Sequence, residues 1–202
     1  MEDNIGVELK PNLDNIPLLA RPMLHYTMFG VSPREIMGKA AFNTIKDKVR
    51  EDCDCHCEIC GRVVLHNSQD KDWLYCHEVY QVDKEKKLYT LERYVGICQQ
   101  CYHYIHTGRL ITLSERGKVN RDYFSRVIKK GNNLLKMVDL KKERNTDIDK
   151  VYALSYEGQI YINDYYSAVA EYARTKNVNV IHFGGVPKCL PNDEYYHSSK
   201  KK

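Results

Sequence analysis

Two closely spaced cysteine pairs are the residues of this sequence best suited to chemistry. The first pair is Cys57 and Cys60 in the segment CEICG, and the second is Cys98 and Cys101 in the segment GICQQC. A C-x2-C turn directs two thiolates toward one point, and a second such turn completes the tetrahedral set that zinc prefers. The sequence therefore predicts a structural Zn²⁺ bound by these four cysteines. The alternative is a group of reduced, metal-free cysteines in a core.

Two more cysteines compete for the first ligand pair. The spacing C-x-C-x-C-x2-C allows Cys53 or Cys55 to replace Cys57 as a ligand. We favour Cys57 because Gly61 closes the segment and permits a tight turn around the metal. Cys53, Cys55 and His56 are expected to be neighbours without metal, although a role as additional ligands stays open.

The composition indicates a globular protein in a reducing compartment. Hydrophobic residues make up 43% and charged residues 29% of the 202 positions, which is ordinary for a globular chain. No apolar run approaches the ~20 residues that a membrane helix needs. Residues 1–4 are polar and acidic, so we expect no secretory signal. Cysteines that cluster in such a chain are more often metal ligands than disulfides.

The segment before the cysteine pairs is expected to contain an arm and a helix. Three prolines interrupt residues 1–31, which predicts an extended arm. An apolar face at helical spacing predicts a helix over 32–49. Cysteine-rich turns follow over 53–61, and a short strand is expected over 63–65.

Between the cysteine pairs, the pattern predicts a β-hairpin. Bulky and polar residues alternate over 73–82, the polar segment 83–87 is a turn, and 88–95 is expected to be the returning strand. The second cysteine pair then opens a helix over 99–106, which Gly108 is expected to end.

The C-terminal third is expected to hold a long helix and a small module. The helix is predicted over 120–142, and the module combines a hairpin over 151–163, a helix over 164–176 and a strand over 178–183. The expected organisation is an arm over 1–31, a zinc-binding domain over 32–143, a tyrosine-rich module over 147–187 and a disordered basic tail over 188–202.

The order of these motifs resembles the HNH endonucleases, which are ββα-metal nucleases, and in particular their zinc-knuckle branch. The segments CEICG, YCHEVYQVD, GICQQC and YIHTGRL follow one another as in that family, and Val31–Arg50 resembles the leader helix of phage and bacterial members. The resemblance covers roughly residues 31–140. It implies an α+β fold with an HNH-like ββα-metal core stapled by the zinc site, flanked by helices and followed by a small C-terminal αβ module.

The resemblance also implies an activity, the hydrolysis of DNA phosphodiester bonds. In this family, a histidine that ends the first hairpin strand acts as general base on a water molecule, and one divalent metal stabilises the phosphate. His77 matches that position, and His106 and Glu78 are candidates to assist it. The implied cofactors are the structural zinc and a catalytic Mg²⁺, Mn²⁺ or Ni²⁺.

Three positions depart from the family pattern. Arg93 stands where the family has its middle asparagine, and Tyr102 stands where it has its final histidine or asparagine. Cys76, which precedes the predicted base, is a ligand too soft for Mg²⁺. His106 lies four residues after Tyr102 on the same helix face and is expected to compensate.

The expected partner is DNA, bound through its backbone. The net charge of +4 is compatible with this partner. The candidate contacts are Arg93, Arg109, Arg116, Lys118 and Arg121, for which an ordinary solvated helix face is the alternative. A second hypothesis is a degenerate HNH fold that binds nucleic acid or protein without cleaving, and a third makes the C-terminal module a surface for a protein partner. We expect no membrane association, and a location in the cytoplasm of a bacterial host or phage-infected cell.

Overall fold

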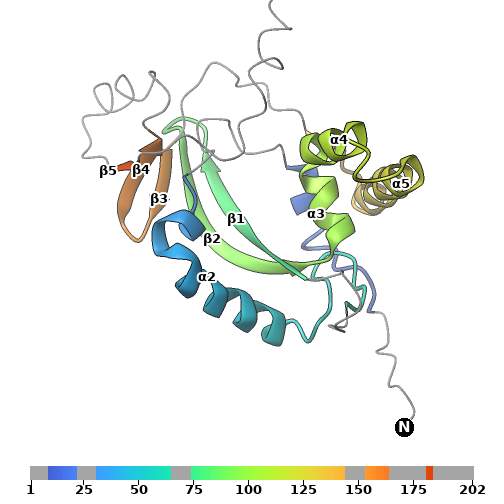
Figure 1. Cartoon of the computed structure of the whole chain (residues 1–202), viewed down its shortest axis with the longest axis horizontal. Helices are drawn as coiled ribbons and strands as arrows, with labels where there is room; N and C mark the ends of the chain where they lie inside the picture. The colour runs from blue at the N-terminus through green and yellow to red at the C-terminus, as the bar shows by residue number, and fades with distance from the viewer. Residues whose placement is uncertain (1–8, 22–30, 65–73, 144–152, 164–180, 184–202) are drawn as a thin grey trace, which may run out of the picture. The chain divides into compact units, whose positions relative to one another are not determined.

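The computed structural model describes residues 9–21, 31–64, 74–143, 153–163 and 181–183 (Figure 1). Within them the chain has the mixed α+β class that the sequence predicts. Five strands form one sheet in the order β1-β2-β3-β4-β5. The elements are α1 (Pro17–Ala20), α2 (Pro33–Asp52), β1 (Tyr75–Asp83), β2 (Leu88–Ile97), α3 (Gln99–Ile105), α4 (Thr107–Glu115), α5 (Arg121–Met137), β3 (Ala153–Tyr156), β4 (Gln159–Asn163) and β5 (Ile181–Phe183).

Contacts group the chain into two compact units that interleave along the sequence. The first unit takes Met1–Met23, Asn43–Val79 and Arg93–Asn145, and the second takes Leu24–Phe42, Tyr80–Glu92 and Thr146–Lys202. The sequence analysis instead expects consecutive domains. The predicted helix over 164–176 and the predicted tail over 188–202 lie outside the described residues. None of the helices in the described part of the chain has the length and apolar character needed to cross a membrane.

The segment around α1 belongs to the core of the first unit. Ile16 and Leu19 are completely buried, and Pro17 occupies the first helical turn, where its missing N–H costs nothing. The backbone N–H of Leu9 donates to the carbonyl oxygen of Gly61 over 3.0 Å, so this segment also lies against the first cysteine turn. The predicted extended arm is therefore wrong over residues 16–20, because the apolar side chains there are buried.

The predicted hairpin is confirmed, with β1 and β2 as its strands. The side chain of Asp83 accepts a hydrogen bond from the backbone N–H of Lys86 over 2.8 Å, and Lys87 takes a positive φ of 54° to complete the turn. Val95 and Ile97 at the end of β2 are completely buried. The end of β2 is therefore buried, and the second cysteine pair follows it directly in the core.

Two short helices follow the hairpin, where the sequence analysis expects one. The chain leaves helical geometry at His106, whose φ is −93° and ψ is 52°, between α3 and α4. The predicted helix over 99–106 agrees with α3 within one residue, but Gly108 does not end it, since this glycine lies in the first turn of α4. The completely buried Leu110 fixes α4 to the core. His106 thus lies at a bend between two helices rather than on a continuous helix face.

Helix α5 packs closely on α3. The side chain of Asn120 caps its start by accepting a hydrogen bond from the backbone N–H of Tyr123 over 2.8 Å. The helix runs unbroken through Gly131 and ends at Met137, five residues before its predicted end. A Cβ atom at Gly131 would lie 2.1 Å from the Tyr104 ring, so glycine allows the two helices to approach.

The second unit has its own small core. Its buried side chains are Val31, Tyr80, Tyr89 and Leu154. Strand β3 pairs in parallel with the first residues of β2, Leu88 to Thr90, and β4 runs antiparallel to β3. The predicted second hairpin is thus present as β3 and β4. The sequence did not predict that this hairpin would pair with β2 and extend the sheet. Helix α2, predicted as continuous over 32–49, is interrupted at Gly38, whose φ is 81°.

Candidate metal centre and histidine site

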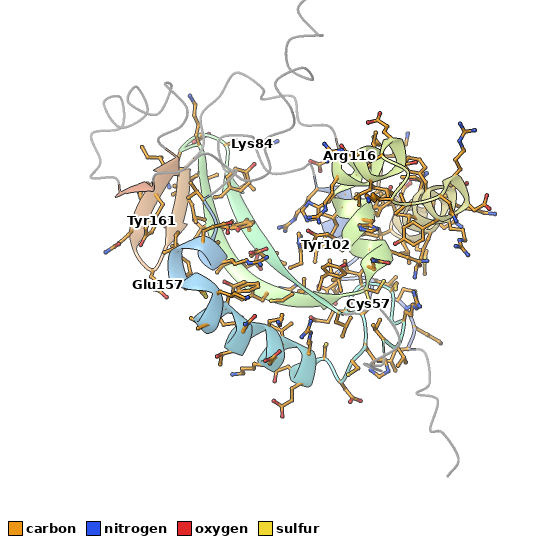
Figure 2. All side chains as sticks on the ribbon, viewed as in Figure 1. Cys57, Lys84, Tyr102, Arg116, Glu157 and Tyr161 are labelled. Carbon is orange, nitrogen blue, oxygen red and sulfur yellow. The ribbon has the colours of Figure 1, made fainter. Side chains whose placement is uncertain are left out.

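The four cysteines that the sequence analysis names come together in the first unit. The sulfur atoms of Cys57, Cys60, Cys98 and Cys101 all lie within 4.8 Å of one another. None of the seven described cysteines forms a disulfide. Among the described residues, no other group of three or more histidine, cysteine or acidic side chains converges in this way. Figure 2 shows Cys57 near the start of α3.

The backbone explains how these sulfurs meet. The N–H of Gly61 donates to the carbonyl oxygen of Cys57 over 2.8 Å, which closes the first turn. Gly61 has a positive φ of 72°, and a Cβ atom there would lie 2.0 Å from the carbonyl oxygen of Leu9. The N–H of Glu58 donates to the carbonyl oxygen of Gly96 over 2.9 Å, which joins this turn to the end of β2. The two cysteine turns are therefore held side by side.

The geometry fits a tetrahedral metal ion. A Zn–S distance of about 2.3 Å corresponds to a sulfur–sulfur edge of about 3.8 Å. The sulfurs of Cys60 and Cys98 are 3.8 Å apart. Cys57 and Cys101 are almost inaccessible to solvent, at 1% and 2%. A cluster of four thiols with this spacing, three of them buried, suits a zinc ion.

The protonation of the thiols supports the same interpretation. Hydrogen bonds from neighbouring thiols, that of Cys101 first, lower the pKa of Cys57 and Cys60. The pKa of Cys101 is raised, chiefly by its hydrogen bond with Cys57. Four sulfurs this close share protons through hydrogen bonds with one another. A bound divalent cation would take the place of those protons.

The other cysteines lie outside this centre. Burial, and then the negative charge of Glu58, raise the pKa of Cys53 to about 11. Burial and the charge of Glu78 raise the pKa of Cys76 to about 12. Both thiols therefore stay protonated and unreactive at neutral pH. Cys55 likewise does not join the cluster, so the interpretation of these residues as neighbours fits the structure.

A lysine accompanies the cysteine cluster. The ammonium group of Lys130 on α5 donates to the side-chain oxygen of Gln100 over 3.2 Å, and Gln100 lies between Cys98 and Cys101 in the sequence. Burial alone would lower the pKa of Lys130, but the negative sulfurs, that of Cys60 first, raise it instead. Lys130 is therefore a cation beside the sulfur cluster.

The second feature is a pair of histidines that the fold brings into contact. The ring centroids of His77 on β1 and His106 after α3 lie 5.3 Å apart, at an interplanar angle of 80°. The ring of Tyr102 lies 4.4 Å from that of His106 and 6.3 Å from that of His77. Both imidazoles are half-buried. The two histidines that the sequence analysis considers together are therefore in contact.

Both imidazoles are neutral at neutral pH. Burial, followed by the positive charge of Lys142, lowers the pKa of His77 to about 4. Burial, followed by the charge of His77, lowers the pKa of His106 to about 3. A neutral imidazole has a free lone pair, which can accept a proton or bind a metal ion.

Lys142 is a cation near this pair that sequence reasoning missed. Its ammonium group donates to three backbone carbonyl oxygens, those of Leu19 at 2.9 Å, Arg21 at 3.0 Å and Ile105 at 3.3 Å. Burial lowers its pKa to about 8. No local pattern marks this residue, because its partners come from segments far away in the sequence.

An aromatic stack borders the histidines. The rings of Tyr75 and Tyr102 are stacked with centroids 4.4 Å apart, and the guanidinium carbon of Arg109 lies 5.9 Å from the centroid of Tyr102. An Nη atom of Arg109 also donates to the Tyr102 hydroxyl over 3.4 Å. Tyr75 lies two residues before His77 on β1, so the strand's period of two could have indicated it. Arg109 is exposed and thus available to an anion beside the pair.

The remaining predicted site residues do not join this cluster. Glu78 does not converge with His77 and His106 into a group of possible metal ligands, although its charge contributes, after burial, to raising the pKa of Tyr102. Arg93 donates to the side-chain oxygen of Asn15 over 2.6 Å, and this contact fixes its guanidinium group. The other predicted DNA contacts are exposed residues near the α4–α5 connection, namely Arg116, Lys118 and Arg121.

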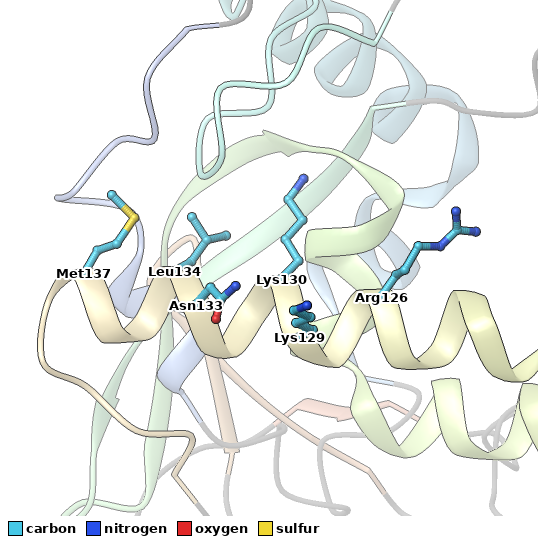
Figure 3. Close-up of a pocket in the computed structure, with 6 residues that line it drawn as sticks. All are labelled: Arg126, Lys129, Lys130, Asn133, Leu134 and Met137. Carbon is cyan, nitrogen blue, oxygen red and sulfur yellow. The ribbon is translucent and has the colours of Figure 1, made fainter.

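A shallow pocket of about 330 Å³ lies on α5 (Figure 3). Its lining residues are Arg126, Lys129, Lys130, Asn133, Leu134 and Met137. Three of these six side chains are cations, so the pocket is basic. It is lined by α5 alone and contains none of the histidines.

Comparisons with known proteins leave the family open. No family model, no curated protein and no solved structure matches this chain. The resemblance to HNH endonucleases therefore stays a prediction from the order of the motifs. The structure itself supports a four-cysteine site of the kind that holds zinc and, in the same unit, a pair of histidines in contact with each other.

Proposed function

We propose that the protein is an HNH-type endonuclease that hydrolyses DNA phosphodiester bonds with His77 as general base. The observation that carries this proposal is the contact between His77 and His106, at a ring distance of 5.3 Å, beside the exposed Arg109. The supporting framework is a hairpin followed by a helix and joined to a four-cysteine cluster. This is the order that the family resemblance implies.

The chain's own residues have separate roles in this proposal. The neutral imidazole of His77 takes a proton from water as the water oxygen bonds to phosphorus, and the bond from phosphorus to the leaving oxygen breaks. Arg109 attracts the phosphodiester and positions it by charge-assisted hydrogen bonds. Tyr102 stacks on Tyr75 and packs against the ring of His106 in a tilted contact, which holds both rings in place.

The family resemblance also implies a divalent metal, which when bound would stabilise negative charge on the phosphate. His77 and His106 offer two imidazole nitrogens, and no third histidine, cysteine or acidic side chain joins them among the described residues. The protein side chains alone are thus an incomplete set of ligands. We therefore assign no step to such an ion.

Plasmid nicking by the purified full-length chain tests the proposal. The protein is assayed with Mg²⁺, Mn²⁺ or Ni²⁺, beside His77→Ala and the control His182→Ala, which changes a histidine in β5. Zinc content is measured for each variant to show that the cysteine centre is intact. Metal-dependent nicking that is lost only in His77→Ala supports the nuclease. Equal nicking by all three proteins excludes His77 as the base.

The pH dependence of cleavage should reflect the lowered pKa of His77. A general base must be unprotonated, and a pKa of about 4 keeps His77 unprotonated at every pH well above that value. We expect kcat/KM, which reports the free enzyme, to change by less than about twofold between pH 8 and pH 5 and to fall below that range. The rate is measured with zinc content checked at each pH. A decline centred near pH 6.5 would contradict the buried, neutral state of His77.

The alternative is a protein of the same fold that binds nucleic acid without cleaving it. The incomplete ligand set at the histidine pair and the engagement of Arg93 by Asn15 favour this alternative. Zinc-loaded protein that nicks no plasmid with any metal, yet binds DNA with an affinity that falls steeply with salt, would establish it.

A further inference from the structure

We propose that Lys130 is a cationic partner of the metal–thiolate centre, and that its charge is needed to retain the metal rather than to fold the chain or to bind DNA. This inference rests on the four-cysteine site and is independent of any nuclease activity. Three observations carry it: the contacts of Lys130, the charge of the loaded centre and the contrast with the adjacent Lys129.

Lys130 lies beside the cysteine centre. The negative charge of the Cys60 sulfur raises the pKa of its ammonium group, against the effect of burial. It also donates over 3.2 Å to Gln100, which lies between the two cysteines of the second turn. Lys130 is half-buried, whereas most cations of α5 are exposed. A partly buried cation on α5 therefore holds a hydrogen bond to the second of the two turns that bind the metal.

The charge of the loaded centre requires such a partner. Four thiolates and one divalent ion carry a net charge of about −2, and burying an uncompensated charge is strongly unfavourable. Burial would lower the pKa of Lys130, but the negative sulfurs of the centre, that of Cys60 first, raise it. The Lys130 cation thus offsets part of the charge at the place where it forms. Groups outside the ligand set commonly change metal affinity by about 10- to 100-fold.

Lys129 provides a matched control on the same helix. It is exposed, and Figure 3 shows the side chains of Lys129 and Lys130 leaving α5 in different directions. Both lysines line the basic pocket, so a role in binding an external anion there would make them equivalent. A role in metal retention makes only Lys130 important.

Zinc transfer to a chromogenic chelator measures this role in the full-length, zinc-loaded chain. The variants are Lys130→Met, which keeps the apolar stem, Lys130→Arg, which keeps the charge, and Lys129→Met. We expect Lys130→Met to release zinc about 10-fold faster than the unmodified chain. Lys130→Arg and Lys129→Met should stay within about twofold of it, because each keeps a cation at position 130. The Co²⁺ spectrum of each variant shows whether the four thiolates still form the site.

Two outcomes would overturn the proposal. One is release from Lys130→Met at the unmodified rate, and the other is equal acceleration in Lys129→Met, which would indicate only a general effect of net charge. Should Lys130→Met fail to load zinc, Lys130→Gln is compared with Lys130→Arg for the rate at which iodoacetamide alkylates the loaded centre. Faster alkylation of Lys130→Gln supports the proposal, since its thiolates have lost their neutralising cation. Equal rates contradict it.

Discussion

Removal of the metal from the four-cysteine centre is expected to unfold the first unit at neutral pH. The centre lies inside the main core, where Cys57, Cys98 and Cys101 are buried together with the apolar side chains of the hairpin and α3. Structural zinc contributes an apparent ~10–16 kcal/mol to small domains. A whole domain is typically stable by about 5–15 kcal/mol. Loss of the ion therefore removes as much free energy as the fold has in reserve.

The measurement compares metal-free and zinc-loaded protein. The ion is stripped by chelator in denaturant, and the chain is refolded with and without added Zn²⁺. Far-UV and near-UV circular dichroism report secondary structure and packing, and Cys98→Ser should reproduce the metal-free state. Cys76→Ser is the control, because Cys76 lies outside the centre. A metal-free protein with an unchanged near-UV spectrum and an unchanged denaturation midpoint would show that the core is stable without the ion.

Gly131→Ala is expected to destabilise the first unit by at least about 3 kcal/mol, the upper end of what overpacking costs. In an exposed helix the same change stabilises by about 1 kcal/mol. The sign reverses here because the added Cβ would lie 2.1 Å from the ring of Tyr104. That ring is buried, and its hydroxyl donates to the side-chain oxygen of Asn132 over 2.7 Å. The ring therefore has little freedom to move aside.

Urea denaturation of zinc-loaded protein measures this effect. Ser125→Ala, at an exposed position of α5, serves as the control and should change stability by less than about 0.5 kcal/mol. Combining Gly131→Ala with Tyr104→Leu should cost less than the sum of the two single changes, because the ring that clashes is gone. Additive costs in this cycle would place the origin of the destabilisation elsewhere.

Local patterns predicted the parts of the fold that depend on neighbours in the sequence. The two cysteine turns, the alternating strands and the turn after Asp83 all depend on residues within a few positions of one another. Each is found at the expected place, within about two residues at the ends. The same holds for the start of α5, where Asn120 caps the helix.

The missed elements are fixed by distant contacts. Helix α1 forms where prolines predict an extended arm, because Ile16 and Leu19 fill the core beside the cysteine turns. The bend at His106 is one residue long and leaves no mark in the periodicity of the segment. The parallel pairing of Leu88 with Ala153 joins residues far apart in sequence, and no hydrophobic period indicates such a partner.

The candidate site likewise combines residues that local spacing predicts with residues that only tertiary packing brings into place. The metal ligands follow from spacing alone, since two C-x2-C turns define their own geometry. The contact between His77 and His106 was expected only through a resemblance, and the structure shows the two rings together. The cations Lys130 and Lys142 reach their partners through tertiary packing. Their roles could not be separated by sequence from those of other surface lysines.

The spacing of the two cysteine turns has a consequence for the order of events during translation. Cys60 and Cys98 are 38 positions apart. At about 5–20 residues per second, the ribosome needs roughly 2–8 s to synthesise the segment between them. During that time the first pair lacks Cys98 and Cys101, and the only other thiols already synthesised beside it are those of Cys53 and Cys55. The nascent chain thus cannot yet form the four-sulfur site of the folded structure.

A second interval follows before the first unit can close. The ammonium group of Lys142 donates to the carbonyl oxygen of Leu19, which lies 123 positions earlier in the chain. The first segment of the core to be synthesised therefore cannot pack until one of the last segments of this unit has been made. Residues 9–20 therefore leave the ribosome long before their packing partners exist. Folding of this unit can therefore be completed only after residue 142 has been synthesised.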